Sequence, residues 1–336
     1  MRRTPLFKEH ERLGARFTVF HGWELPLDYG SALKEALAVR EKAGLFDVSH
    51  MGRLLVRAKP EKLEPLFTAP VKRTPVGRVR YGFFLNETGG ILEDATLYRL
   101  DEELFLFCTN AANRERVKAL LSNFEVKDLT AETLQLALQG PESTRLLEPF
   151  FPVTGLKYYS FKRFGRVIIS RTGYTGERVG YELFLPVEQG VELFRKLAGS
   201  AQPCGLAARD VLRVEAGLPL YGNELNERVT PLEVRLERFL KEEPFVGKEA
   251  LKKRPVKVVL TGFEASGGVP RKGYAVYADG RKVGVVTSGV YSPYLKKAVG
   301  FALVKPGLSE GTPVVFKQKE REIKGTLARY PFIRRE

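Results

Sequence analysis

The chain has 336 residues, 43% of them hydrophobic, so it is long enough for two or three domains that each bury a core. Lys and Arg number 55 against 40 Asp and Glu, a net charge of +15 that favours an anionic partner, although basic runs mixed with acids argue against nucleic acid. No window reaches the roughly 18 consecutive apolar residues of a membrane span and no secretory signal begins the chain, so we expect a cytoplasmic protein without a membrane partner.

The first predicted helix follows the turn residues at 28–30. Ser31 can cap it, apolar residues recur after it at helical spacing, and Gly44 suits the left-handed residue that ends a helix. From 53 to 109 the pattern changes to alternating, strand-like runs, and a helix is expected at 112–121. The N-terminal part therefore mixes helices with strands.

Further strand-like runs lie between 134 and 185, and 207–217 is expected to be a helix stopped by glycine. From about Val256 the chain changes to short, closely spaced strand-like runs. Asp279 and Gly280 give the strongest hairpin signal in the sequence. These patterns predict an α+β chain without βαβ alternation and with a small C-terminal antiparallel barrel or sandwich.

The stretch LNETGGILEDATLY, residues 85–98, places two acids in the middle of a predicted strand. Successive side chains of a strand point to opposite faces, so Glu93 shares a face with Ile91 while Asp94 shares the other with Leu92. Both faces carry apolar residues. One of the two acids must therefore lean toward the apolar interior or toward a cleft.

Two other segments allow a functional or a structural interpretation. The glycines of RTGYTGERVGYELF, residues 171–184, could let backbone approach a ligand beside Glu177, but a tight hairpin is the favoured explanation. On the predicted helix at 207–217, Arg209 and Arg213 lie one turn apart. They could clamp a carboxylate, or they could form internal ion pairs.

Histidine and cysteine offer little catalytic chemistry. His50 could act as a general base, but capping or stabilising a turn is the favoured role. Cys108 lies in a strand-like run and is expected to be a small buried residue. His10, His21 and His50 are not paired at metal-ligand spacing, so no metal site is predicted.

Ten stretches, in order over nearly the whole chain, resemble the T protein, or aminomethyltransferase, of the glycine cleavage system. They are TPLFKEHERLGARF, FHGWELPLDYGS, LAVREKAGLFDVSHMG, YGFFLNETGGILEDATLY, NAANRE, ALQGPES, RTGYTGERVGYELFLP, PCGLAARDVLRVEAGLPLYGNEL, FVGKEAL and VTSGVYSPYLKKAVGFALV. The resemblance implies a three-domain fold around a central folate pocket. Its domains would be 1–51 with 133–230, then 52–132 with 231–255, and a C-terminal β-barrel at 256–336.

The resemblance also implies a reaction. An aminomethyl group carried on the lipoyl arm of the H protein is split, its carbon passes to tetrahydrofolate as the 5,10-methylene bridge, and ammonia and the reduced lipoyl arm are released. Asp94 would be the catalytic carboxylate beside the reactive folate nitrogens, with Glu93 as a structural partner or a solvent-facing acid. Folate contacts are implied for Met51, Tyr81, Tyr98, Asn110, Glu177 and Arg209.

The sequence departs from the family pattern at two places. Glu237 and Arg238 stand where the family usually has a Gly-Trp pair, so an aromatic wall is expected to be missing there. Ala207 replaces a glycine and requires ordinary αR or β backbone. The main alternative function is a folate-binding factor of the same superfamily that serves iron–sulfur protein assembly or repair without methylene transfer, but its Lys-Gly-Cys motif is absent.

Overall fold

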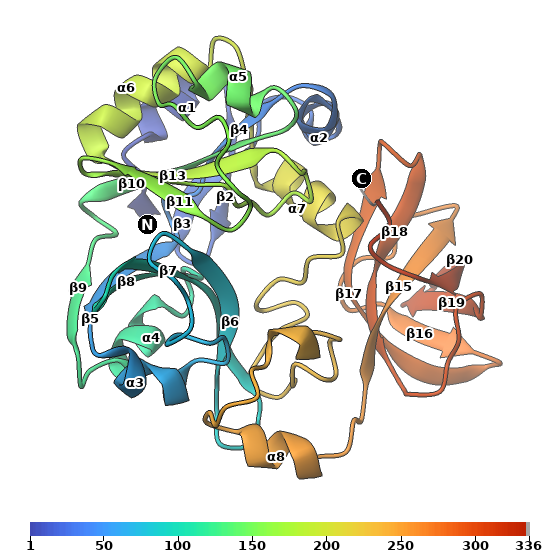
Figure 1. Ribbon diagram of the computed structural model, residues 1–336. Coiled ribbons are helices and arrows are strands. Elements are labelled where there is room, and N and C mark those ends of the chain that lie inside the picture. The colour runs from blue at the N-terminus through green and yellow to red at the C-terminus, as the bar shows by residue number, and fades with distance from the viewer. Residues whose placement is uncertain (334–336) are drawn as a thin grey trace.

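The computed structural model describes residues 1–333, whose strands form three open sheets and a closed barrel (Figure 1). The mixed helix and strand content confirms the α+β prediction. The largest sheet has six strands in the order β11-β12-β13-β10-β4-β14. They are β11 Phe161–Phe164, β12 Val167–Ser170, β13 Gly180–Pro186, β10 Thr133–Gln139, β4 Gly44–Asp47 and β14 Gln202–Cys204.

A five-stranded antiparallel sheet inserts between two strands of the six-stranded one, because the chain leaves β4 at Asp47 and returns at Thr133. Its order is β6-β7-β8-β5-β9, with β6 Val79–Leu85, β7 Ile91–Asp101, β8 Leu104–Thr109, β5 Gly52–Arg57 and β9 Glu125–Asp128. Near the N-terminus, β1 Arg2–Arg3, β3 Trp23–Asp28 and β2 Arg16–Phe20 form a small third sheet. The exact domain boundaries remain a prediction.

Arg53 binds both of the segments that connect the six-stranded sheet to the five-stranded one. Its side chain is only 1% exposed, and its guanidinium donates to the carbonyls of Ser49 and Met51 on the outgoing segment and of Thr130 and Thr133 on the returning one. The distances are 2.6–3.1 Å. A buried guanidinium with several donors in a fixed plane can satisfy these carbonyls together, which holds the crossings side by side.

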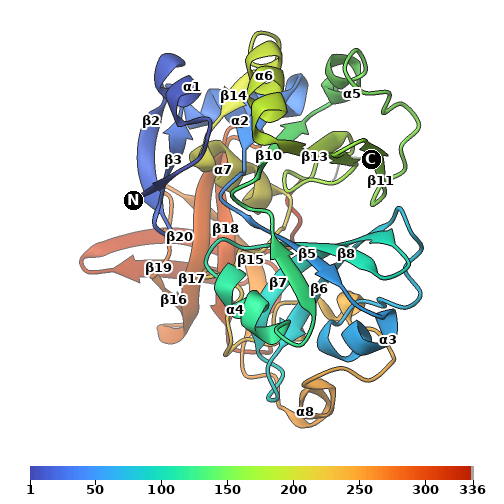
Figure 2. The same cartoon turned by 90° about the vertical axis from the view of Figure 1, so that its left-hand side faces the viewer.

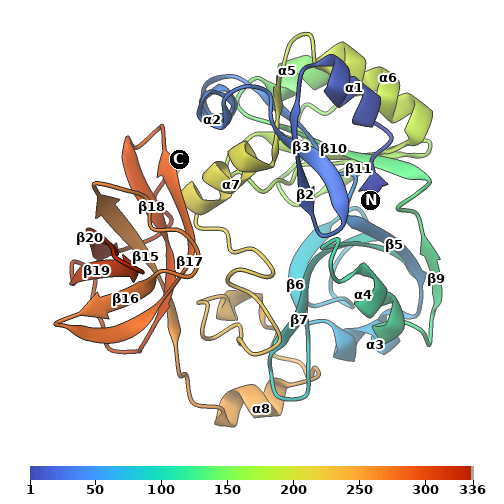
Figure 3. The ribbon, with the colours of Figure 1, turned by 180° about the vertical axis from the view of Figure 1, so that it is seen from behind.

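Helices cover the open sheets, as Figures 2 and 3 show from the side and from behind. The helices of residues 1–333 are α1 Phe7–Arg12, α2 Ala32–Glu41, α3 Pro60–Leu63, α4 Arg114–Leu120, α5 Ser143–Leu147, α6 Val187–Leu197, α7 Leu206–Glu215 and α8 Lys248–Lys253, with 3₁₀ turns η1 Glu64–Leu66 and η2 Glu237–Phe239. Helix α8 does not cover a sheet and lies in the segment that leads to the barrel. Helix α7 packs against α2 on one side and against strands of the barrel on the other. None of the helices in residues 1–333 has the length and apolar character needed to cross a membrane.

The C-terminal strands close into the predicted antiparallel barrel, in the order β15-β18-β17-β16-β19-β20. The strands are β15 Val259–Ser266, β18 Lys297–Val304, β17 Arg281–Ser292, β16 Ala275–Ala278, β19 Pro313–Gln318 and β20 Arg321–Ala328. The hairpin at Asp279 and Gly280 is confirmed, since φ is +49° and +73° there, as a two-residue turn with both central residues left-handed requires.

The predicted end of α2, the helix that follows Ser31, is wrong in one detail. Ser31 does cap α2, accepting a hydrogen bond from the Lys34 N–H at 3.4 Å, but the helix ends at Lys42 with φ of −136°. Gly44 is the first residue of β4, and a Cβ there would lie 2.3 Å from Val39 and 2.8 Å from the Cys204 sulfur. This glycine is therefore required for close packing and not for a left-handed turn.

Gly90, in the turn before β7, yields a stability prediction. A Cβ at this position would lie 1.9 Å from the Glu227 carbonyl oxygen, which cannot move aside without shifting backbone. We expect Gly90→Ala to destabilise the fold by about 1–3 kcal/mol, the usual cost of overpacking, measured as a lowered Tm. Gly199→Ala is the matched control, because its nearest neighbour would be 3.7 Å away. Equal Tm values for the two variants would contradict the prediction.

Candidate functional site

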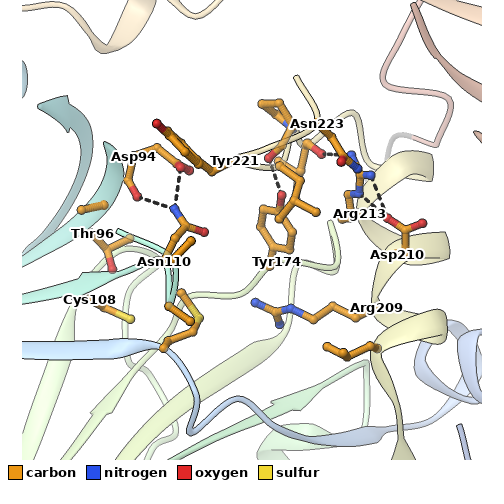
Figure 4. A pocket seen from close by; sticks show the side chains of 18 of the residues that line it. Asp94, Thr96, Cys108, Asn110, Tyr174, Arg209, Asp210, Arg213, Tyr221 and Asn223 are labelled. Carbon is orange, nitrogen blue, oxygen red and sulfur yellow. Dashed lines mark hydrogen bonds and ion pairs between the residues drawn. The ribbon is translucent and has the colours of Figure 1, made fainter. Parts of the chain in front are cut away.

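A cavity of about 540 Å³ opens where the sheets, α7 and the connecting segment 217–239 meet (Figure 4). Met51, Tyr81, Asp94, Asn110 and Arg209 line it, so five of the seven residues predicted from the resemblance come together. Figure 4 shows Asp94 and Asn110 on one side of the cavity and Arg209 on the other. The cavity is therefore built from segments far apart in the sequence.

Strand pairing places Asn110 beside Asp94. Strands β7 and β8 are antiparallel with Thr96 opposite Cys108, and the same register continued by two residues brings Asn110 opposite Asp94. The Asn110 amide donates to Asp94 Oδ1 at 2.7 Å, and the Tyr81 hydroxyl donates to Oδ2 at 3.0 Å. Burial raises the pKa of Asp94 to about 6, and these two hydrogen bonds oppose the shift. Asp94 is thus a positioned carboxyl group that titrates near neutrality.

Of the two roles expected for Glu93, structural partner or solvent-facing acid, the structure shows the structural one. It is fully buried on the opposite face of β7 and accepts hydrogen bonds from the Asn110 N–H at 2.5 Å and from the Asn113 amide at 2.6 Å. Burial and the charge of Asp94 raise the pKa of Glu93 well above its ordinary value. The expectation of a solvent-facing acid is therefore wrong, and Glu93 fixes the asparagine that binds Asp94.

Arg209 and Glu182 form a second polar group in the cavity. Arg209 stacks over the Tyr174 ring at 4.9 Å, and within residues 1–333 its buried Nη1 has no hydrogen-bond partner. Burial lowers the pKa of Arg209, and the charge of Glu182 opposes that shift. Glu182 accepts from the Thr172 hydroxyl at 2.7 Å and lines the cavity. A buried donor without a partner is costly, so this group suits a ligand that supplies hydrogen-bonding atoms.

Glu182 was not predicted from the sequence, although strand alternation contains a signal for it. Along β13, Tyr181 and Leu183 pack into the core of the six-stranded sheet, so Glu182 points to the other face. Glu177, the predicted contact, lies in the preceding turn and is ion-paired with the buried Arg40 at 2.6 Å. Glu177 does not line the cavity, and its contact with folate remains a prediction from the resemblance.

Tyr98 likewise does not line the cavity. It is fully buried between Phe161 and Phe184, and its hydroxyl lies 3.2 Å from the Ser170 hydroxyl. Its position supports the sheet beside the cavity. A direct contact between Tyr98 and folate also remains a prediction.

The glycines and arginines of the two ambiguous segments have mainly structural roles. Gly176 has φ of +78°, while Gly173 makes room for the Gln139 side chain. Arg213 is buried and ion-paired with Asp210 and Glu224, so the internal ion-pair interpretation is correct for Arg213. Arg213 and Arg209 both line the cavity, and Arg209 is the one whose Nη1 has no hydrogen-bond partner among the described residues (Figure 4).

His50 and Cys108 also line the cavity. Burial, reinforced by the charge of Arg209, lowers the pKa of His50 to about 3, so the imidazole is neutral at physiological pH. Its Nδ1 has no hydrogen-bond partner among the described residues, so that atom does not stabilise a turn. Cys108 is buried as predicted, and burial raises the pKa of its thiol to about 12. Neither side chain is a strong base or nucleophile here.

Glu237 and Arg238 carry no ring, as expected, but the cavity has an aromatic wall beside them. The next residue, Phe239, lines the cavity with its ring edge-on to Tyr81, at 4.8 Å between centroids. Ala207 lies within α7 and takes the helical backbone that was expected of it. Phe239 therefore supplies an aromatic ring next to the two positions that lack one.

A carboxyl group that titrates near neutrality, aromatic rings and a buried cation line one cavity, an arrangement typical of an enzyme's active site. Residues 6–243 match the model of the GCVT N-terminal domain, and residues 259–333 match that of the glycine cleavage T-protein C-terminal barrel domain. The chain therefore belongs to the glycine cleavage T-protein family, the aminomethyltransferases, which in general depend on folate.

Individual relatives of the family are similar to this chain over nearly its full length. The chain is 49% identical to an aminomethyltransferase of Aquifex aeolicus, covering 98% of this chain and 95% of the relative. It is 43% identical to one of Thermus thermophilus, covering 99% of each. The solved aminomethyltransferase T of Bartonella henselae superposes with a TM-score of 0.94 at 33% identity, over 99% of this chain and 98% of the other. These names do not favour the iron–sulfur alternative.

Proposed function

We propose that this protein transfers the methylene carbon of an aminomethyl group, borne on the lipoyl arm of a carrier H protein, to tetrahydrofolate. The carbon–nitrogen and carbon–sulfur bonds of the carrier adduct break, ammonia and the reduced lipoyl thiol leave, and the carbon bridges two folate nitrogens. The observation that carries the proposal is Asp94, a carboxyl group in the cavity bound by Asn110 and Tyr81. The proposed compartment is the cytoplasm.

Asp94 has the properties that this transfer requires. A carboxylate fixed by two hydrogen bonds can orient an amine, stabilise the positive charge that develops as ammonia leaves, and accept a proton. With a pKa of about 6, it is largely ionised at pH 7 and still basic enough to take that proton. No protein nucleophile is needed, since the sulfur belongs to the carrier.

Tetrahydrofolate fits the remaining polar groups of the cavity. Its pterin ring carries adjacent N–H groups that can donate hydrogen bonds to a carboxylate. The ring also carries acceptor atoms that could bind Arg209 Nη1, which has no hydrogen-bond partner among the described residues. Glu182 is a carboxylate that lines the same cavity as Arg209, and its charge favours the charged form of Arg209. The net charge of +15 also suits the glutamyl carboxylates of folate and an acidic carrier protein.

The direct test is ammonia release from an aminomethylated lipoyl carrier protein, with and without tetrahydrofolate. We expect release that depends on folate and on carrier, with 5,10-methylenetetrahydrofolate formed in equal amount. A native protein that binds folate but releases no ammonia in a folate-dependent way would contradict the transfer reaction. That outcome would restore the non-catalytic folate-binding function.

A paired substitution tests which glutamate recognises the ring. We expect Glu182→Gln to weaken tetrahydrofolate binding about ten- to a hundredfold, because loss of a charge-assisted hydrogen bond costs about 1.5–3 kcal/mol. Glu177→Gln is the comparison, since Glu177 is paired with Arg40 outside the cavity. The measurement is the Kd by calorimetric titration. A larger loss in the Glu177 variant would reverse the assignment.

A further inference from the structure

The rim of the cavity at η2 carries a guanidinium linked to the reactive centre by a row of rings. Tyr81 donates to Asp94 at 3.0 Å, the ring of Tyr81 meets that of Phe239 at 4.8 Å, and the Arg238 guanidinium lies over the Phe239 ring at 4.8 Å. All four residues line the same cavity. The row therefore leads from the buried carboxyl group outward to an exposed positive charge.

The charge of Arg238 is not neutralised by an ion pair. Among residues 1–333 no Asp or Glu oxygen lies within 4.0 Å of its guanidinium nitrogens, and the adjacent Glu237 is not paired with it. Its field still enters the cavity. Burial, Tyr158 and Glu182 raise the pKa of the lining residue Tyr159, and the charge of Arg238 opposes that rise. A cation on a cavity rim that has no counter-charge is ready to bind an anion.

Two of the arginines that line the cavity, Arg209 and Arg238, suit different parts of one ligand. Arg209 is buried beside Glu182 and Tyr174, where a neutral ring that both donates and accepts hydrogen bonds is stabilised. Arg238 is solvent-exposed, where a hydrated carboxylate can pair without a large desolvation cost. A ligand that uses both must be long, with a flat polar ring at one end and an anionic tail at the other.

We propose that Arg238 binds the glutamyl carboxylates of the folate tail and makes the enzyme favour folates with more than one glutamate. This inference rests on the proposed function. Arg238 stands where the wider family usually has tryptophan, so the contact belongs to this chain's own sequence. The ring of Phe239 keeps the wall of the cavity, and the guanidinium stacked on that ring is pre-oriented for a carboxylate.

Equilibrium titrations with three ligands test the inference. They are tetrahydropteroate, which has no glutamate, tetrahydrofolate with one, and its triglutamate. We expect Arg238→Gln to weaken binding of the triglutamate about fivefold and of tetrahydropteroate less than twofold, in line with an exposed charge-assisted contact. Arg238→Lys, which keeps the charge, is expected to retain most of the preference.

Arg235→Gln is the control matched for charge, since Arg235 is exposed three residues earlier and does not line the cavity. We expect this variant to bind all three ligands like the native protein. If Arg238→Gln weakened binding of all three ligands equally, the residue would only support the aromatic wall. If Arg238→Gln and Arg235→Gln weakened binding equally, the effect would come from the overall positive charge of the protein and not from a contact with Arg238. Either result overturns the inference. Native protein that binds none of the three ligands would overturn the proposed function as well.

Discussion

Asp94→Asn is expected to reduce folate-dependent ammonia release at least about tenfold, and up to the roughly 10²–10⁴-fold that a positioned acid or base contributes. The new asparagine has nearly the shape of the aspartate it replaces. Its side-chain oxygen can still accept the hydrogen bond that the Asn110 amide donates to Asp94 Oδ1 at 2.7 Å in the native protein. It cannot accept a proton at neutral pH or carry negative charge beside the transferred carbon. The loss should therefore fall on kcat, measured with the aminomethylated carrier at saturating folate.

The pH dependence provides a second measurement on the same residue. Because burial raises the pKa of Asp94 to about 6, the ionised form is lost as pH falls through that value, so native kcat/KM should decline below about pH 6. A carboxyl group with a raised folded-state pKa lowers stability as pH rises from its unfolded to its folded pKa. The asparagine variant escapes that loss, so its Tm at pH 8 should be no lower than native. A native-like rate for this variant would remove Asp94 from the mechanism.

Local patterns predicted most of the strands that carry the site. Alternation along β7 separated Glu93 from Asp94, and this separation is what lets one acid fix Asn110 while the other enters the cavity. The hairpin at Asp279 and Gly280 could also be predicted from the sequence, because few residue types adopt its positive φ angles. These features depend on residues near one another in the chain, where sequence reasoning is strongest.

Features that depend on distant pairing were not predictable in the same way. The insertion of one sheet between β4 and β10 follows from pairing across more than eighty residues, and only the family resemblance suggested it. Glu182 escaped notice because its strand is otherwise apolar, whereas Glu177 lies in a conspicuous turn. Phe239 was overlooked because a ring can reach the same wall from a neighbouring position. Burial and direction of side chains decide these points.

Arg213→Met is expected to cause the largest loss of stability, about 3–5 kcal/mol, the usual cost of breaking a buried ion pair from one side. Arg213 is 1% exposed and donates to Glu224 at 2.9 Å and to the Ser288 hydroxyl of the barrel at 2.6 Å. Methionine fills similar space but leaves the fully buried Glu224 without its cation. The measurement is the midpoint of thermal unfolding, compared with Ser288→Ala. That variant removes the hydroxyl that binds Arg213, Asn223 and Glu224 but leaves the ion pair, so it should cost less, about 1–3 kcal/mol.

The double variant Arg213→Met/Glu224→Gln separates charge from packing. If the cost arises from the orphaned carboxylate, neutralising Glu224 should recover much of the lost Tm, whereas a packing defect would persist. Glu224 also accepts the Leu220 N–H at 2.9 Å, and Leu220 lines the cavity. The ion pair thus joins α7, the cavity rim and the barrel. Folate affinity should therefore fall together with Tm in Arg213→Met, and both should recover in Arg213→Met/Glu224→Gln. Native-like Tm in the single variant would show that the barrel is held in place by apolar contacts alone.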